Sequence, residues 1–338
     1  MNYSEIIKSS FNTFWRHKAL WVFGIILAFV GKGDFGFSVN YQESFSYPSD
    51  PSEIPEIPNP FDNWLFASFF ENPLPYIIGF SLLSVIFWII SNFIGWFAHG
   101  ALIGMVDEID QVDTTSVRSG WELGKAKVKS LFTLAVVFAI PQLIIFLPAI
   151  IIGLVFFFQM FDILGEGFFT GDLPSPEEME AKFASILPAF FMGFACLFPT
   201  IFLGGIISWA IRIVHIMAAR SCVLEHLGVR NSVKRGWHIT RYNIGYTLLN
   251  WLFLTIISGI IGFMAAFPAL VLWIPTARAF MRNEWSTMSI ISGILVILYF
   301  LVVGVLFGGI LSSFNSTVWT KLYKGFLAKE RATNQPPV

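Results

Sequence analysis

The sequence has little charge. Asp, Glu, Lys and Arg make up 13% of its 338 residues, about half of the roughly 25% that is typical of soluble globular domains. So few charged side chains cannot cover a water-facing surface, which excludes an ordinary soluble domain. Hydrophobic residues instead make up 55% of the chain, with 38 Phe and 12 Trp. The composition therefore predicts an integral membrane protein.

The sequence also lacks the motifs of several function classes. Two cysteines, Cys196 and Cys222, cannot supply a disulfide framework. No phosphate-binding Gly loop, His-Glu-x-x-His motif or paired Asp within a span is present, so nucleotide binding and the common hydrolase mechanisms have no support. We predict no catalytic residue, no metal and no cofactor, because no ligand spacing is present. Nucleic-acid binding has no support beyond scattered basic residues.

Long uncharged stretches take the place of charge. Five of them exceed the roughly 20 residues that a helix needs to cross a bilayer: residues 72–106, 130–161, 183–211, 242–277 and 285–320. A sixth stretch, residues 19–31, is shorter. The internal repeat described below favours a span there, and its flanking residues do not resemble a cleavable signal peptide. We therefore expect six transmembrane helices.

The basic residues are unequally divided between the two sides of these spans. Most of the 21 Lys and Arg lie in the N-terminal region, residues 107–129, residues 212–241 and the C-terminus. The loops between are acidic, at 32–71 and 162–182. The positive-inside rule then predicts a multi-pass protein of the plasma or inner membrane with both termini in the cytoplasm.

A six-residue motif occurs twice. Residues 116–121 (SVRSGW) return as 232–237 (SVKRGW), and a looser copy stands at 10–15 (SFNTFW). His99 and His215 keep the same offset as the two hexads. Each copy is followed by an apolar run, so the chain reads as three repeat units.

The repeat predicts the fold class, which is all-α. Six transmembrane helices form three pseudo-repeated hairpins, each preceded by an amphipathic helix in the membrane interface. The units are residues 1–106, 107–222 and 223–327, followed by a disordered tail at 328–338.

In each interfacial helix we expect a Trp at the headgroup level and basic groups toward anionic lipid. Membrane lipids, anionic on the cytoplasmic side, are therefore the predicted partners, and a protein partner is left open. Plain anchoring is favoured over lipid sensing. The predicted anchors are Trp15, Trp121, Trp237, Arg118, Lys234 and Arg235.

Two histidines are the best candidates for a shared polar site. His99 and His215 occupy equivalent places in two units, where Glu108 or Glu225 could serve as a partner. The favoured alternative is that each His only snorkels or caps its own helix. The amides deepest in spans, Asn92, Gln142 and Asn250, more often bond between helices than bind substrate. Arg212 is expected to snorkel from the inner edge of the fourth span.

Pairs of small residues one turn apart predict close helix contacts. We favour packing within the chain over oligomerisation. The pairs are Gly100 with Gly104, Gly204 with Ser208, and Gly304 with Gly308.

One stretch of the chain resembles the membrane domain attached to some bacterial glycerophosphodiester phosphodiesterases. It consists of residues 219–225 (ARSCVLE), Val229, and the hexad 232–237 with its apolar run. Related stand-alone six-span bacterial proteins of unknown function look similar. Gly236 stands where that family usually has Ser. The resemblance covers about forty residues and implies a bacterial integral membrane domain. It does not imply phosphodiesterase activity, because the catalytic barrel is not in this sequence.

Three function classes remain open. We favour a membrane scaffold or accessory protein that acts through lipid or partner-helix contacts. A transporter or channel for a lipid or small molecule is the alternative, because Pro141, Pro148, Pro199 and Pro268 could break helices. An intramembrane enzyme is the third. A cavity lined by one of the three deep amides would favour transport.

Overall fold

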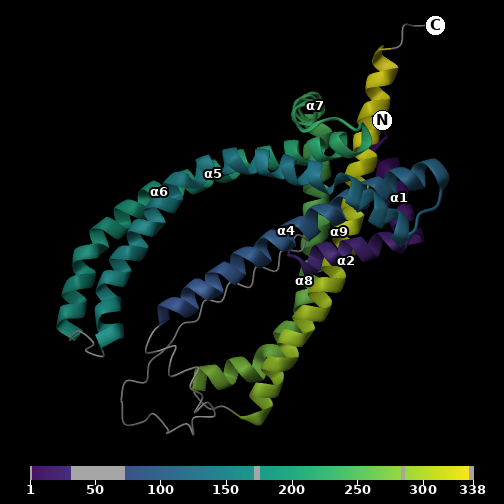
Figure 1. The fold of residues 1–338 in the computed structure, drawn as a ribbon. Coiled ribbons are helices and arrows are strands. Elements are labelled where there is room, and N and C mark those ends of the chain that lie inside the picture. The colour runs from purple at the N-terminus through teal and green to yellow at the C-terminus, as the bar shows by residue number, and fades with distance from the viewer. Residues whose placement is uncertain (1, 32–72, 171–175, 283–285, 335–338) are drawn as a thin grey trace. The chain divides into compact units, whose positions relative to one another are not determined.

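The computed structural model describes residues 2–31, 73–170, 176–282 and 286–334, and every regular element in them is a helix (Figure 1). The predicted proline-rich loop at 32–71 lies outside the described residues. The helices are α1 (Tyr3–Arg16), α2 (Ala19–Phe29), α4 (Pro73–Val112), α5 (Val117–Thr170), α6 (Pro176–Leu224), α7 (Val229–Tyr242), α8 (Ile244–Arg282) and α9 (Thr287–Asn334).

Five of these helices are long and apolar enough to cross a bilayer. The qualifying stretches are 32 to 46 residues long, and only 6 to 11% of the most apolar window in each is buried inside the protein. On α4, large apolar side chains such as Phe80 and Trp88 are 74% and 66% exposed. Apolar surface of this extent needs a non-aqueous surrounding. The helices therefore fit an integral, multi-pass membrane protein.

The predicted sixth span corresponds to α2, which has 11 residues. At 1.5 Å per residue this helix is about 17 Å long, against a hydrocarbon thickness of about 30 Å. Val30 and Gly31 end it, and Gly31 has a φ of 70°. As described, α2 does not cross a bilayer by itself.

Two of the three predicted interfacial helices are separate helices. The first, α1, is separated from α2 by His17 and Lys18, and α7 is separated from α8 by Asn243. The second predicted interfacial helix is not a separate helix. Its residues, which follow Ser116, form the first part of the 54-residue helix α5, which has no break. The helix continues through residue 130, where the predicted span begins.

The prolines inside the spans do not end their helices. Pro141 and Pro148 lie within α5, Pro199 within α6, and Pro268 within α8. The expectation that they could divide these helices is therefore not met. Neighbouring helices and local adjustments can tolerate proline within a span.

Two compact bodies divide the chain. The α6/α7 body comprises residues 1–6, 129–252 and 319–338, and the α2/α4 body comprises residues 7–128 and 253–318. Each collects segments that are far apart in the sequence, since α1, α5, α8 and α9 contribute to both. The three repeat units divide the sequence differently and stay a prediction.

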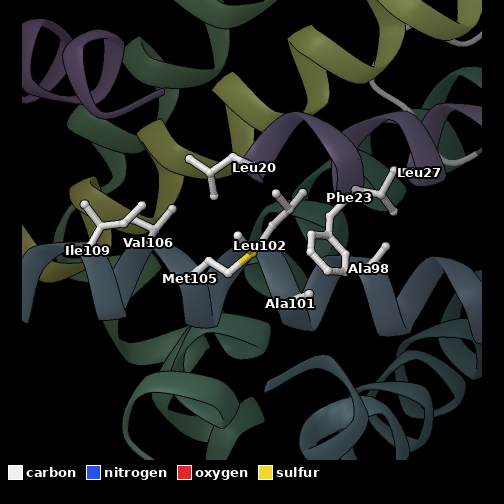
Figure 2. Close-up of a cluster of buried hydrophobic side chains, with 9 residues drawn as sticks. All are labelled: Leu20, Phe23, Leu27, Ala98, Ala101, Leu102, Met105, Val106 and Ile109. Carbon is white, nitrogen blue, oxygen red and sulfur yellow. The ribbon is translucent and has the colours of Figure 1, made fainter. Parts of the chain in front are cut away.

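The α2/α4 body has a continuous apolar contact between the two helices for which it is named (Figure 2). One face of α2 packs against residues of α4 that recur at helical spacing, which is why both stripes are buried. The nine residues are Leu20, Phe23, Leu27, Ala98, Ala101, Leu102, Met105, Val106 and Ile109.

The α2/α4 body also contains a close crossing of α2 and α9. A Cβ on Gly309 would lie 2.6 Å from Ile25 Cα. A Cβ on Gly24 would collide with Gly309 O and with Ser313 Oγ. The Ser313 hydroxyl donates to Leu20 O at 2.9 Å. This crossing tolerates nothing larger than glycine at either position.

Candidate functional site

The hexad glycines are the contact points between each motif and the helix that precedes it. A Cβ on Gly236 would lie 2.7 Å from Ala218 N and 2.8 Å from Ala218 Cβ on α6. At the equivalent position, a Cβ on Gly120 would meet Met105 Sδ and lie 2.5 Å from Phe23 Cε2. The glycine of each hexad is therefore required by close packing, a role that the sequence reasoning did not assign.

The tryptophan that follows points away from that contact. Trp15, Trp121 and Trp237 are 56%, 57% and 57% exposed. In the looser copy Phe14 replaces the glycine, is 3% exposed and stacks on Trp21 with ring centroids 5.5 Å apart. Every copy thus has a buried residue and an exposed Trp in succession.

The first hexad bonds a carboxylate near the end of α4. The Ser119 hydroxyl donates to both oxygens of Glu108 at 2.7 Å, and the Thr115 hydroxyl donates to Oε2 at 2.7 Å. Asp113, which follows α4, has a φ of 55°. This left-handed residue ends the helix and returns the chain so that Ser119 can reach Glu108.

The second hexad makes the corresponding bond with a charged residue. Arg235 is at the same hexad position as Ser119, and its Nε lies 3.2 Å from Oε2 of Glu225, just after α6. His226 follows with a φ of 52°. The glutamates proposed as histidine partners are therefore bonded by the fourth residue of each hexad.

Arg235 extends this second contact into a network with α9. Its Nη1 and Nη2 donate to Glu330 at 2.9 and 2.6 Å, and the Tyr323 hydroxyl donates to Glu225. Tyr323 is fully buried, and the Arg235 side chain is 24% exposed. The hydrogen bond to Glu330 is the main cause that raises the pKa of Arg235 above its usual range, while burial opposes it. One guanidinium thus joins the end of α6 to α7 and α9.

This network changes the expectation for one predicted lipid anchor. Arg235 is turned toward Glu225 and Glu330 inside the α6/α7 body. Arg118, in contrast, has a side chain 92% exposed beside Glu122, and Lys234 is exposed. Of the three basic hexad residues, Arg118 and Lys234 are the exposed ones.

The two predicted site histidines lie in different bodies, His99 in the α2/α4 body and His215 in the α6/α7 body. His99 is edge-on to Trp96 with ring centroids 6.0 Å apart, and His215 stacks on Phe138 at 4.8 Å. Glu108 follows His99 by nine residues on α4, which is a helical rise of about 14 Å. The shared site stays a prediction.

The three deep amides have different surroundings. Asn92 donates to Trp88 O in its own helix at 2.8 Å, and Asn250 accepts from the Tyr3 hydroxyl at 3.1 Å. Burial raises the pKa of Tyr3 to about 12, so its hydroxyl stays protonated and able to donate at neutral pH. Gln142 lines a groove between α5 and α6.

That groove lies between α5 and α6 in the α6/α7 body and has a volume of about 540 Å³. The two helices run side by side there (Figure 1), with Gly204 packed against Ile145. Its lining residues are Ala139, Gln142, Leu143, Phe146, Ile150, Gly205, Ser208, Trp209 and Arg212.

The predicted small-residue pairs lie in varied surroundings. A Cβ on Gly104 would lie 3.1 Å from Leu123 Cβ, and one on Gly204 would lie 2.9 Å from Ile145 Cγ2. Gly100 and Gly308 are buried, and Gly304 is half-buried. Ser208 lines the groove. Next to the third pair, sequence reasoning missed Gly309, whose contact with α2 depends on a helix almost 300 residues away.

No metal-binding cluster of three or more His, Cys, Asp or Glu occurs in residues 2–31, 73–170, 176–282 and 286–334. No protein-family model, curated protein or solved structure matches the chain. The resemblance based on residues 219–237 therefore stays a prediction.

Proposed function

We propose that this integral membrane protein is a scaffold or accessory protein that acts through contacts with membrane lipid. The observation that carries the proposal is the exposure of the hexad tryptophans. Trp15, Trp121 and Trp237 are each slightly more than half exposed although the residue before each is buried. An exposed Trp beside a packed backbone suits the membrane interface, where its ring meets acyl chains and its N–H meets water.

Basic side chains accompany these tryptophans. Arg118 and Lys234 are exposed within their hexads. Lys18 Nζ lies 4.1 Å from the Trp15 ring centroid and 3.7 Å from that of Trp21. A basic residue near an anionic leaflet contributes about 1 kcal/mol to the free energy of membrane binding. Anionic phospholipid is therefore the proposed partner.

The finer architecture belongs to the same proposal. Three pseudo-repeated hairpins, interfacial placement of α1 and α7, and cytoplasmic termini in a bacterial inner membrane follow from the hexads and the charge distribution. The resemblance to the membrane domain of bacterial glycerophosphodiester phosphodiesterases supports this placement. A partner protein would dock on the same lipid-facing helices.

The test is the thermal stability of the full-length protein in nanodiscs of phosphatidylglycerol and of phosphatidylcholine. We expect a higher Tm in the anionic lipid, and we expect the Arg118→Gln, Lys234→Gln double variant to lose a large part of the difference. The charge-conserving double variant Arg118→Lys, Lys234→Arg is the control and should retain it. Equal Tm values of the wild type in both lipids would contradict the proposal.

A second candidate, transport of a lipid or small molecule, is supported by the groove that contains Gln142. Such a role would require solute to cross sealed vesicles that contain the protein. Intact α5 and α6 around Pro141, Pro148 and Pro199 do not resemble the broken helices of many transporters. We therefore rank transport below the scaffold.

A further inference from the structure

The groove between α5 and α6 is built from one face of each helix. On α6 the lining positions Gly205, Ser208, Trp209 and Arg212 follow the spacing i, i+3, i+4 and i+7. The α5 residues from Ala139 to Ile150 follow the same spacing, continued by one turn. The groove is therefore elongated and runs along two helices, and it is not formed by loop residues.

Its two ends differ in polarity. The helices are antiparallel, since Phe138 stacks on His215 while Ile145 packs on Gly204. Ala139 and Gln142 therefore lie beside Trp209 and Arg212, and Phe146 lies beside Gly205. From Arg212 to Gly205 the rise along α6 is about 10 Å. The groove is polar and cationic at one end and apolar at the other.

Polar groups at the cationic end are left without partners inside the protein. Ser208 Oγ and Trp209 Nε1 are buried and have no hydrogen-bond partner among the described residues. A buried polar atom without a partner is costly, so a ligand that supplied acceptor oxygens would offset the cost. Arg212, which is exposed, adds a fixed positive charge beside them.

The apolar end is open because of a second glycine. A Cβ on Gly205 would meet nothing within 4 Å, whereas the neighbouring Gly204 is in close contact with Ile145. Gly204 thus holds the helices together, and Gly205 leaves room between Phe146, Ile150 and its own backbone. The space suits an unbranched hydrocarbon chain.

We propose that this groove binds one phospholipid molecule, with its phosphate at Arg212 and an acyl chain along Leu143, Phe146 and Ile150. A phosphate has several acceptor oxygens, which matches one guanidinium with Gln142, Ser208 and Trp209 as further donors. A volume of about 540 Å³ lies in the range of small-molecule sites. The site deepens the lipid contacts of the proposed scaffold and rests on that function.

The experiment is native mass spectrometry of the purified, delipidated full-length protein titrated with phosphatidylglycerol. We expect one tightly bound lipid per chain. Arg212→Gln should weaken its binding at least about tenfold, because a charge-assisted bond to phosphate is lost, and Arg212→Lys should restore most of it. Gly205→Leu should abolish the adduct by filling the apolar end without touching the helix contact.

Matched controls remove the same charge or add the same side chain elsewhere. Arg278→Gln neutralises another arginine outside the groove, and Gly259→Leu fills open space on α8. Both should bind lipid like the wild type. If Gly205→Leu and Arg212→Gln also bind like the wild type, or if glycerol phosphate competes as well as the lipid, the groove assignment is wrong.

The outcomes separate this site from the scaffold proposal. Loss of the single adduct in the Arg212 and Gly205 variants supports the groove whether or not bulk anionic lipid raises the Tm. A Tm that is independent of lipid charge would contradict only the scaffold proposal. If both groove variants keep the lipid adduct, and the Tm still depends on lipid charge and on Arg118 and Lys234, only the groove assignment is contradicted.

Discussion

The two hexads have similar sequences but differ in the helices that they connect. In both, the glycine packs against the preceding helix, the fourth residue reaches a glutamate at that helix's end, and the Trp is exposed. The first uses a neutral hydroxyl, Ser119, on Glu108. The second uses Arg235, which bonds Glu225 and also Glu330 of α9. One substitution in the motif thus adds a third helix to the contact.

The backbone after each hexad differs as well. The first hexad continues into the long helix α5, whereas the second lies on α7, which ends at Tyr242. Asn243 separates α7 from α8 and receives a backbone bond from Thr247. The motif therefore fixes how the chain returns onto the preceding helix, and the residues beyond it decide whether a separate surface helix forms.

The largest expected effect concerns the two hexad glycines. Gly236→Ala should reduce the free energy of unfolding by about 3 kcal/mol, because its Cβ meets the Ala218 backbone, which cannot move aside. Gly120→Ala should cost less, about 1 to 2 kcal/mol, because its Cβ meets the ends of two side chains, Met105 and Phe23, rather than backbone, and because alanine favours the helix by about 1 kcal/mol. Unfolding by SDS in mixed micelles measures both.

Gly259→Ala is the control for this pair, because its Cβ would meet nothing within 4 Å. It should be neutral or slightly stabilising. Equal losses for Gly120→Ala and Gly236→Ala would show that the two hexads pack in the same way and would contradict the expected difference.

Removal of the charge at the fourth position should have the next largest effect. Arg235→Gln leaves Glu225 and Glu330 without their guanidinium and should cost about 2 kcal/mol, in the range for hydrogen bonds to charged groups. Arg118→Gln, whose pair with Glu122 is exposed, should change stability by less than about 0.5 kcal/mol. If the two variants are equally stable by SDS unfolding, the Arg235 network does not hold α9.

The corresponding change in the first hexad should be smaller. Ser119→Ala removes one neutral donor from Glu108 and should cost about 1 kcal/mol, because Thr115 still donates to that carboxylate. Ser119→Thr keeps the hydroxyl and is the control. A loss as large as that of Arg235→Gln would mean that charge at this position adds nothing.

The tryptophans should show the smallest difference in detergent. Trp121 packs edge-on against Phe97 with ring centroids 4.7 Å apart, and no ring contact is found for Trp237 among the described residues. Trp121→Ala should therefore cost about 1 kcal/mol more than Trp237→Ala in micelles. In phosphatidylglycerol nanodiscs both should lower the Tm, and an unchanged Tm for Trp237→Ala would count against its interfacial role.

Much of the helical architecture could be read from the sequence. The five longest uncharged stretches correspond to the five helices that can cross a bilayer, because length and hydropathy alone decide that property. The sequence reasoning also named Glu108 and Glu225 as candidate polar residues. The sequence did not show that the fourth residue of each hexad bonds these glutamates, because that contact depends on left-handed residues, Asp113 and His226, that return the chain. The shared histidine site stays a prediction.

Other features depend on contacts that no local pattern contains. Glu330 and Tyr323 lie about 100 residues from the groups they bond. Gly204 and Gly205 are neighbours in the same apolar run, yet one is in close contact and the other faces open space. Only the angular position of each residue against α5 separates them.

Composition and periodicity were enough to predict the membrane class, the five long helices and the repeat of the hexad. These follow from composition and periodicity, because the bilayer selects apolar length without regard to which helices become neighbours. The tertiary structure decided that Arg235 is turned inward, that α5 is unbroken and that a groove ends at Arg212. Those outcomes depend on which helix faces meet and pack closely, and no local sequence pattern contains that information.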